Sequence, residues 1–396
     1  MQLSFPRGFL WGSATASYQV EGGIENNDWA EAARAGKVPA CGRGCDHATL
    51  YEKDFDIVQG LSQNAHRLSL EWSRIEPEEG TFDATAIEHY KKVLRALDRR
   101  GIAPFVTLWH FTLPIWLSRK GGFAHAHAAK AFARYSAYVI EQFREEFPRL
   151  HIMTVNEPEV FISKGYAEGT WPPFKRHSYA QLWQVMHNLI KAHNLAYRAI
   201  KSVAPEARVG LSKHNRYFHA TTQGPFALGA TALMGWLWNR YFINGISGHM
   251  DFIGLNYYTH QPFGAVRETY VKNDMGWDIM PEGLYHVLKE LGHYHMPIYI
   301  TENGVADRDD IHRKQFIIDH LAATHRAIQE GIDVRGYFYW SLLDNYEWAE
   351  GFKERFGLVE VVYETLERRV RPSAYVYKDI CEQNAVEIAD NAILES

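Results

Sequence analysis

The chain has 396 residues, a formal net charge of −5, 46% hydrophobic residues and 22% charged residues. These proportions are typical of a soluble globular enzyme. The net charge is negative, and lysine and arginine form no block in the sequence. Both features argue against a nucleic-acid or membrane-surface partner. The 12 Trp, 22 Tyr and 21 Phe are many, but flat apolar rings suit a packed core as well as the C–H faces of sugars, so they favour carbohydrate binding only weakly.

Three cysteines, Cys41, Cys45 and Cys381, are too few for a disulfide framework. Cys41 and Cys45 lie close to His47, but their spacing lacks the second pair of ligands that a zinc site uses. Reduced thiols in a cytosolic loop are the better interpretation. The N-terminal residues contain no apolar run of signal-peptide length. We therefore expect a cytoplasmic protein without a metal or a cofactor.

Short apolar or β-branched runs predict eight strands, near residues 8–14, 64–70, 103–109, 151–156, 207–212, 251–257, 296–301 and 335–341. Helical periodicity separates them, near 83–100, 129–147, 179–203, 282–293, 311–330 and 373–384, and less regularly near 50–62 and 226–243. Eight βα units predict an α/β fold, a single (β/α)8 TIM barrel. We expect one catalytic domain over residues 1–396, with a frayed tail at about 385–396.

Polar or aromatic side chains lie at or just beyond the C-terminal ends of nearly all these strands. They are Gln19, His110, Asn156, Glu157, Asn256, Tyr258, Glu302, Asn303, Trp340 and Glu347. This edge carries the active site in TIM barrels. A cap or a loop hydrogen bond explains one such residue, but it is a weak explanation for almost every strand end at once.

Glu157 and Glu302 each directly follow an apolar run, beside an asparagine. Desolvating a carboxylate is costly unless it is paired, so each of them could be an ion-paired acid at the barrel end. Together they supply what cleavage of a glycosidic bond requires, a proton donor and a nucleophile or base. The residues alone predict a barrel enzyme that uses a pair of carboxylates.

The segments around these two glutamates resemble the β-glycosidases of glycoside hydrolase family 1. TVNEP (154–158) and ITENG (300–304) contain the glutamates. Six further blocks follow the family's order: FLWGSATASYQVEGG (9–23), RLSLEWSRIEP (67–77), TLWHFTLPIWL (107–117), LNYYT (255–259), YWSLLDNYEW (339–348) and RFGLV (355–359). The resemblance extends from about residue 5 to residue 383.

The resemblance implies that Glu157 is the acid/base and Glu302 the nucleophile of a retaining mechanism with a covalent glycosyl-enzyme intermediate. It implies that Arg67 and Tyr258 support the nucleophile, together with Asn256. Around the sugar it places Gln19, His110, Asn156, Trp340, Glu347, Trp348 and Phe356. Taken singly, Trp340 and Phe356 could instead be packing residues, and Arg67 an ion-pair partner of Glu71.

The implied substrates are β-glycosides or short oligosaccharides with a terminal non-reducing β-D-glucosyl residue, and also galactosyl or fucosyl residues. Relatives that act on 6-phosphosugars lack an acid at the position of Glu347. A carboxylate about 4 Å from a phosphate charge costs about 4 kcal/mol at an effective dielectric near 20, which disfavours that alternative. A transglycosylase stays open, and a glycan-binding pseudoenzyme is disfavoured because both glutamates are present. Nothing indicates the oligomeric state.

Two departures from the family pattern stand out. The loops after the fourth, sixth and seventh strands are shorter than in many family members, which would open the aglycone side of the site, where Trp171, Phe174 and Trp277 are candidate lining residues. Glu71 stands where many members have a small residue. It could pair with Arg67 or with Arg74, and the sequence does not decide between them.

Overall fold

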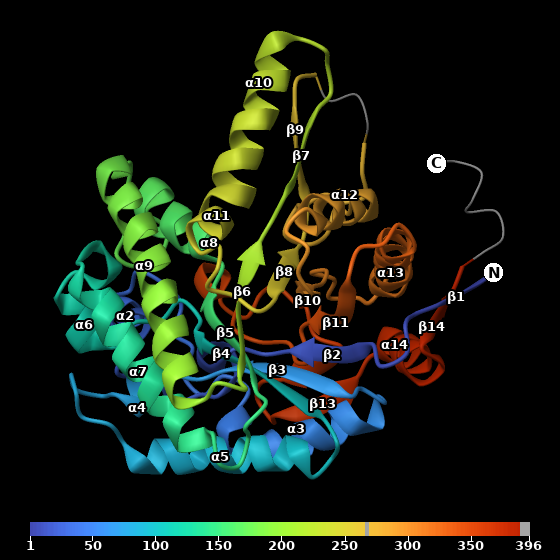
Figure 1. Cartoon of the computed structure of the whole chain (residues 1–396). Helices are drawn as coiled ribbons and strands as arrows, with labels where there is room; N and C mark the ends of the chain where they lie inside the picture. Colours follow the sequence, from blue (N-terminus) through green and yellow to red (C-terminus); the bar gives the residue numbers. More distant parts are fainter. Residues whose placement is uncertain (266–268, 389–396) are drawn as a thin grey trace.

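Eight parallel strands close into a barrel in the computed structural model, which describes residues 1–265 and 269–388 (Figure 1). Around the barrel the strands follow the order β10-β11-β2-β3-β4-β5-β6-β8. In chain order they are β2 (Leu10–Ala14), β3 (Ala65–Ser69), β4 (Ala103–Trp109), β5 (His151–Asn156), β6 (Arg208–His214), β8 (Ile253–Tyr257), β10 (Ile298–Asn303) and β11 (Val334–Trp340). The predicted TIM barrel is confirmed, and every strand boundary lies within two residues of its predicted position.

Helices surround the barrel and connect its strands. The longer ones are α3 (His47–Gly60), α5 (Ala84–Asp98), α7 (His127–Phe143), α9 (Tyr179–Val203), α10 (Pro225–Met234), α12 (Pro281–Gly292), α13 (Arg313–Gln329) and α14 (Pro372–Gln383). Each matches a predicted helix. The Asp83 side chain accepts hydrogen bonds from the backbone N–H groups of Thr85 and Ala86, which explains why α5 begins there.

Several shorter helical segments lie in the connections. They are α1 (Ser17–Val20), α2 (Asp28–Arg34), α4 (Trp72–Ile75), α6 (Ile115–Arg119), η1 (Gly122–Ala124), α8 (Pro158–Ile162), η2 (Ser163–Glu168), η3 (Gly235–Arg240), α11 (Tyr241–Gly245) and η4 (Trp348–Glu350). Two of them, η3 and α11, continue the helix predicted near 226–243, and the others were not predicted. Most of them are too short for a 3.6-residue periodicity to be visible in the sequence. No helix in the described part of the chain is long and apolar enough to cross a bilayer.

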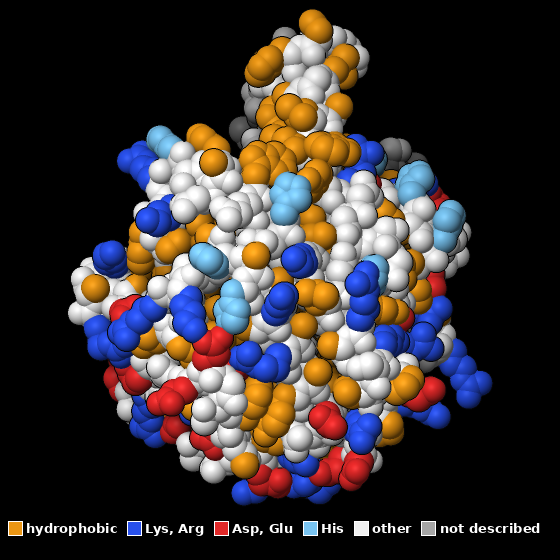
Figure 2. All heavy atoms as spheres, turned by 60° about the vertical axis from the view of Figure 1, so that its left-hand side comes forward, with side chains coloured by type: hydrophobic (Ala, Val, Ile, Leu, Met, Phe, Trp, Pro, Cys, Tyr) orange, Lys and Arg blue, Asp and Glu red, His pale blue; other side chains and the backbone are white. Residues whose placement is uncertain are grey.

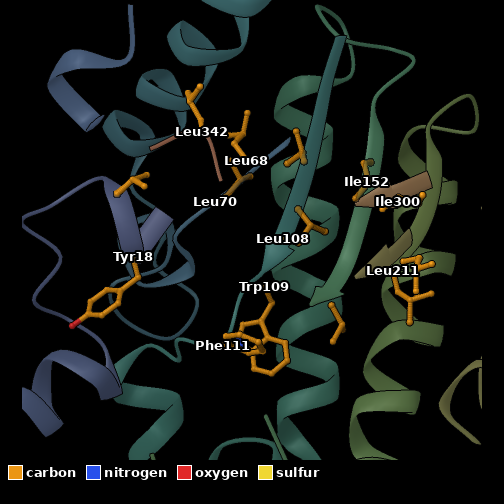
Figure 3. Close-up of a cluster of buried hydrophobic side chains, with 14 of the residues drawn as sticks. Tyr18, Leu68, Leu70, Leu108, Trp109, Phe111, Ile152, Leu211, Ile300 and Leu342 are labelled. Carbon is orange, nitrogen blue, oxygen red and sulfur yellow. The ribbon is translucent and has the colours of Figure 1, made fainter. Parts of the chain in front are cut away.

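Strand alternation divides the core into an inner and an outer part. Inward-facing side chains fill the N-terminal part of the barrel, among them Phe105, Met153, Phe252, Tyr299 and Phe338. Gly12 makes room for them, because a Cβ atom there would lie 2.7 Å from the Phe338 ring. The outward-facing side chains belong to the larger core between strands and helices, including Leu108, Ile152, Leu211 and Ile300 (Figure 3).

An arm projects from the barrel beyond β6 (Figure 1). We define it as β7 (Tyr217–Ala220), residues 221–224, α10, η3 and β9 (His260–Phe263). β7 and β9 pair in a separate two-stranded sheet, and α10 packs beside them. The sequence predicted a less regular helix near 226–243, but it gave no sign that the first part of this helix stands away from the barrel.

The two ends of the described chain lie side by side. β1 (Gln2–Ser4) pairs antiparallel with β14 (Ala385–Glu387). Residues 385–387 therefore form a strand, and their prediction as the start of a frayed tail is wrong, because the tail prediction did not consider β1 as a partner. Residues 389–396, the rest of that predicted tail, lie outside the described residues. Another unpredicted hairpin pairs β12 (Val359–Val362) with β13 (Glu367–Val370).

Candidate active site

The two strands that precede the glutamates are irregular next to them. The register of β5 against β6 shifts between Met153 and Asn156, and that of β10 against β8 shifts between Ile300 and Glu302. Such irregularities re-aim side chains, and they are common beside active sites. Both carboxyl groups line one cavity at the C-terminal end of the barrel.

Glu302 is buried among hydrogen-bond donors. Arg67, on β3, forms an ion pair with Glu302 Oε1, and the Tyr258 hydroxyl donates to Oε2 over 2.5 Å. Arg67 is itself held by three other acceptors, the Thr107 hydroxyl, the Thr301 carbonyl and Asn156 Oδ1. Donors of this kind favour the ionised form of a carboxylate. The surroundings therefore suit a carboxylate that carries a negative charge.

Glu157 has different surroundings. Among the described residues, the hydrogen-bond donor to its carboxyl group is Asn256 Nδ2 at 2.8 Å, and the residue is 7% exposed. Burial first, and then the negative charge of Glu302, raise the pKa of Glu157 to about 8. Asn256 also accepts a bond from the Thr301 hydroxyl at 2.7 Å, which orients its amide group. At neutral pH Glu157 is therefore mostly protonated, while its neighbour is surrounded by donors.

The cavity has a volume of about 320 Å³ and walls that are largely aromatic. The rings of Trp340 and Trp348 each lie nearly parallel to that of His110, at 13° and 11°. Tyr258 and Phe356 pack together on another side. The pKa of His110 lies well below its usual value because of burial and of Arg67, so the imidazole is neutral. Flat rings next to a few polar groups suit a ring-shaped ligand with hydroxyl groups.

Glu347 also lines this cavity, on the loop that follows β11. Burial first, and then the charge of Glu302, raise its pKa to about 8, with smaller contributions from Glu350 and Glu354. Three acidic side chains, Glu302, Glu350 and Glu354, thus act on the carboxyl group of Glu347, and negative charges at this position disfavour an anionic ligand.

Comparison with known proteins identifies the family to which this chain belongs. The sequence model of Glycosyl hydrolase family 1 matches residues 1–246 and 259–386. The chain belongs to this family. Beta-glucosidase A of Thermotoga maritima is 34% identical to it over 444 residues, covering 97% of this chain and 99% of the relative. A beta-galactosidase of Sulfolobus acidocaldarius is 31% identical, covering 97% and 96%.

Solved structures agree with this assignment. A beta-glycosidase from Pyrococcus horikoshii superposes with a TM-score of 0.92 and 40% identity, covering 98% of this chain and 97% of that one. The beta-glucosidase from Thermotoga maritima in complex with glucoimidazole superposes with a TM-score of 0.91 and 32% identity. The chain is thus a β-glycosidase, a hydrolase that acts on O-glycosyl bonds, as its sequence predicted.

Most of the predicted site residues of this β-glycosidase lie together. The predicted residues that line the cavity are His110, Asn156, Glu157, Tyr258, Glu302, Trp340, Glu347, Trp348 and Phe356. Arg67 and Asn256 lie behind them and reach the two glutamates through hydrogen bonds.

Gln19 lies beside the cavity and does not line it. Its amide nitrogen donates to Asn345 Oδ1 and to the Tyr346 carbonyl, at 2.9 and 2.8 Å. Its buried Oε1 has no hydrogen-bond partner among the described residues. Gln19 thus holds the loop that carries Glu347, and it keeps a free acceptor.

Each of the two arginines considered as a partner for Glu71 forms an ion pair with another glutamate. Arg67 pairs with Glu302, and Arg74 pairs with Glu21 at 3.1 Å. Glu71 accepts hydrogen bonds from uncharged donors, namely Ser17, Asn27, Ser73 and Thr112. Glu71 therefore leaves the guanidinium of Arg67 available to Glu302.

On the outer side of the cavity, Trp171 and Trp277 line the wall, as predicted, whereas Phe174 packs against Lys37. Sequence reasoning missed Lys164, His214, Arg216 and Met275, which line the cavity as well. His214 ends β6, two residues beyond the predicted end of this strand. A longer strand prediction would have placed His214 at the C-terminal rim.

The residues around Cys41 have partners of their own. The thiols of Cys41 and Cys45 donate to the carbonyls of Tyr18 and Asp344, each over 3.0 Å. His47 bonds Asp54 at 2.8 Å. These three side chains face different partners, which fits the interpretation that they do not form a zinc site.

Proposed function

We propose that this β-glycosidase hydrolyses terminal non-reducing β-D-glucosyl residues, and accepts galactosyl and fucosyl residues, by double displacement with retention of configuration. The observation that carries this proposal is the contrast between the surroundings of two glutamates that line one cavity. Glu302 lies among donors that favour its charge, and burial and Glu302 raise the pKa of Glu157.

In the first step, a carboxylate oxygen of Glu302 attacks the anomeric carbon and the bond to the aglycone oxygen breaks. Glu157 gives its proton to that oxygen, so the aglycone leaves as a neutral alcohol. Glu302 becomes a glycosyl ester and loses its charge, so one of the causes that raise the pKa of Glu157 disappears. Glu157 then takes a proton from water, whose oxygen attacks the anomeric carbon and releases Glu302.

Several neighbours support the substrate class. Trp340 offers an apolar platform for the C–H face of a sugar ring, while His110, Asn156, Glu347 and Trp348 offer polar groups to its hydroxyls. Gln19 has one free acceptor beside them. Because Glu347 holds its proton near neutral pH, the full-charge argument against 6-phosphosugars is weaker than expected. The carboxylates of Glu302, Glu350 and Glu354, which act on Glu347, still disfavour a phosphate dianion at this position.

The deciding experiment is proton NMR of the first-formed sugar from 4-nitrophenyl β-glucoside. We expect β-glucose to appear before mutarotation, and α-glucose as the first product would refute retention. Glu302→Gly should retain the fold and lose turnover. A panel of nitrophenyl β-glycosides tests the glycone, and a preference for mannose would contradict this assignment. Glycosides longer than the donor as main products would favour the transglycosylase instead.

We place this activity in the cytoplasm. The supporting observation is that Cys41, Cys45 and Cys381 are buried free thiols, as is usual in a reducing compartment. Fractionation of the source cells with an antibody tests this, and recovery outside the cytoplasmic membrane would contradict it.

A further inference from the structure

The helix of the arm, α10, exposes large apolar side chains to solvent. Of the residues of α10, Ala227 is the buried one. Phe226 is 81% exposed, Leu233 55% and Leu228 47%. Figure 2 shows the arm standing out from the globular body with hydrophobic side chains along it and at its tip. Apolar patches of this kind on a soluble protein usually mark a surface that another apolar phase covers.

The apolar side chains are distributed around the helix. Phe226 and Leu233 lie seven positions apart and share one side, whereas Leu228, two positions from Phe226, points roughly the opposite way. Between Arg216 and Arg240 the sequence has no Asp, Glu, Lys or Arg. A protein partner covers one side of a helix, while an all-round apolar helix suits a surrounding apolar medium.

Aromatic side chains gather where the arm meets the barrel. Trp236 and Trp183 are 42% and 40% exposed, and both pack edge-on against Tyr241, with ring centroids 5.2 and 5.4 Å away. Tyr179, one turn before Trp183 on α9, is 60% exposed. Tryptophan and tyrosine prefer the boundary between hydrocarbon and water, because one part of each ring system is apolar and another forms hydrogen bonds.

Acidic and basic side chains are unevenly distributed below the arm. On the face shown in Figure 2, most acidic side chains lie on the half of the molecule away from the arm, whereas basic and histidine side chains reach up to its base. Lys175 and Arg176, just before Tyr179, are exposed, and so is Arg240 at the end of η3. Cations at this level complement anionic lipid headgroups.

We propose that the arm inserts α10 into one leaflet of an anionic lipid bilayer and holds the enzyme on the membrane surface. The ten residues of α10 extend about 15 Å, which is half of a hydrocarbon core about 30 Å thick. The helix thus enters a leaflet without crossing the bilayer. This departs from the expectation, drawn from net charge, that the protein has no membrane partner, because net charge does not report a local apolar projection.

Insertion would also orient the cavity. Trp238, on η3, donates to the carbonyl of His214 at 3.1 Å and packs against the guanidinium of Arg216 at 4.8 Å. His214 and Arg216 both line the cavity. The base of the arm is therefore continuous with the cavity wall, so the docked enzyme holds this wall next to the lipid headgroups.

Flotation with vesicles of phosphatidylcholine and phosphatidylglycerol tests the proposal. Wild-type protein should float with the vesicles, and Phe226→Gln/Leu233→Gln should lower the partition coefficient by about tenfold or more, because two large apolar side chains are lost. Ile311→Gln/Tyr375→Gln is the matched control, since these residues are 69% and 54% exposed and lie outside the arm. The control should float like the wild type.

Hydrolysis of a soluble nitrophenyl glucoside shows that each variant is folded, and it is independent of flotation. The proposal fails if the wild type stays with the soluble fraction, or if the arm variant floats as well as the control. It also fails if light scattering gives twice the 45.6 kDa monomer mass, the arm variant halves that mass, and no protein floats. A second copy of the chain would then be what covers the arm.

Discussion

At the scale of single residues, the two glutamates differ in their surroundings, and this difference supports the proposed nucleophile and the proposed acid. Arg67 and Tyr258 give Glu302 two donors, whereas Glu157 has the single amide of Asn256. A motif can identify both glutamates, but the contrast between them depends on side chains from β3, β8 and the loop after β8, which only the folded chain brings together.

Replacement of Glu157 tests its role as the acid. Glu157→Gln keeps the shape and the contact with Asn256 but has no proton of suitable acidity to donate. We expect kcat/KM to fall by about 10²–10⁴ on an alkyl β-glucoside with a poor leaving group, and by much less on dinitrophenyl β-glucoside. Equal losses on the two substrates would contradict the assignment.

The raised pKa of Glu157 predicts the alkaline limb of the pH profile. In the proposed mechanism the protonated form of Glu157 is the active acid, so kcat/KM should be lost as the pH rises through about 8. In Glu302→Gln the charge that helps to raise this pKa is gone, and the carbon-13 NMR titration of Glu157 should shift to lower pH. An unchanged titration in that variant would show that burial alone sets the pKa.

At the scale of elements, a buried ion pair joins the loop after β11 to the C-terminal part of the chain. Arg371 donates two hydrogen bonds to Asp344, at 3.0 and 2.9 Å, and Asp344 also accepts one from the Gly357 backbone. Arg371 directly precedes α14, and Asp344 lies three residues before Glu347. The pair thus positions the loop that carries a wall of the cavity.

Removal of Arg371 should therefore destabilise the protein. Arg371→Ala leaves Asp344 buried with Arg355, at 3.4 Å, as a remaining charged partner. We therefore expect the free energy of unfolding to fall by about 3 kcal/mol in denaturant titrations, at the lower end of the range for a broken buried pair. Arg369→Ala, two residues earlier on β13, breaks an exposed pair with Glu367, and it should cost less than about 1 kcal/mol. Similar losses in both variants would argue against a special contribution of the buried pair.

The elements also show what the sequence could predict. The hydrophobic pattern located all eight barrel strands, because short apolar or β-branched runs are separated by helical segments along the chain. The register shifts beside Asn156 and Glu302 are not visible in the hydrophobic pattern of the sequence, since they depend on pairing with β6 and β8. Gln19 shows the same limit, because its position beside the cavity depends on the distant residues Asn345 and Tyr346.

At the scale of the whole molecule, the pairing of β1 with β14 brings the two ends of the described chain together. The Asn384 side chain accepts a hydrogen bond from the Trp11 indole at 2.9 Å and donates one to the Phe5 carbonyl at 2.8 Å. Val386 is fully buried in the outer core. These contacts tie the last strand to the segment that leads into the first strand of the barrel.

Truncation after Asn384 should weaken the fold and spare the chemistry. It removes the partner of β1 and the buried side chain of Val386, so we expect a loss of about 2–4 kcal/mol of unfolding free energy. KM on a nitrophenyl glucoside should stay unchanged, because these residues lie at the opposite end of the barrel from the cavity. A changed KM would mean that the terminal sheet influences the cavity.

The proximity of residues 1 and 388 allows this β-glycosidase to be cyclised or immobilised away from its cavity. Because β1 and β14 lie side by side before the first barrel strand begins, a short linker from residue 388 to residue 1 would join them into a ring, and new ends could be opened in an exposed connection elsewhere. An enzyme immobilised through residue 1 or residue 388 would keep its catalytic opening turned toward the surrounding solution.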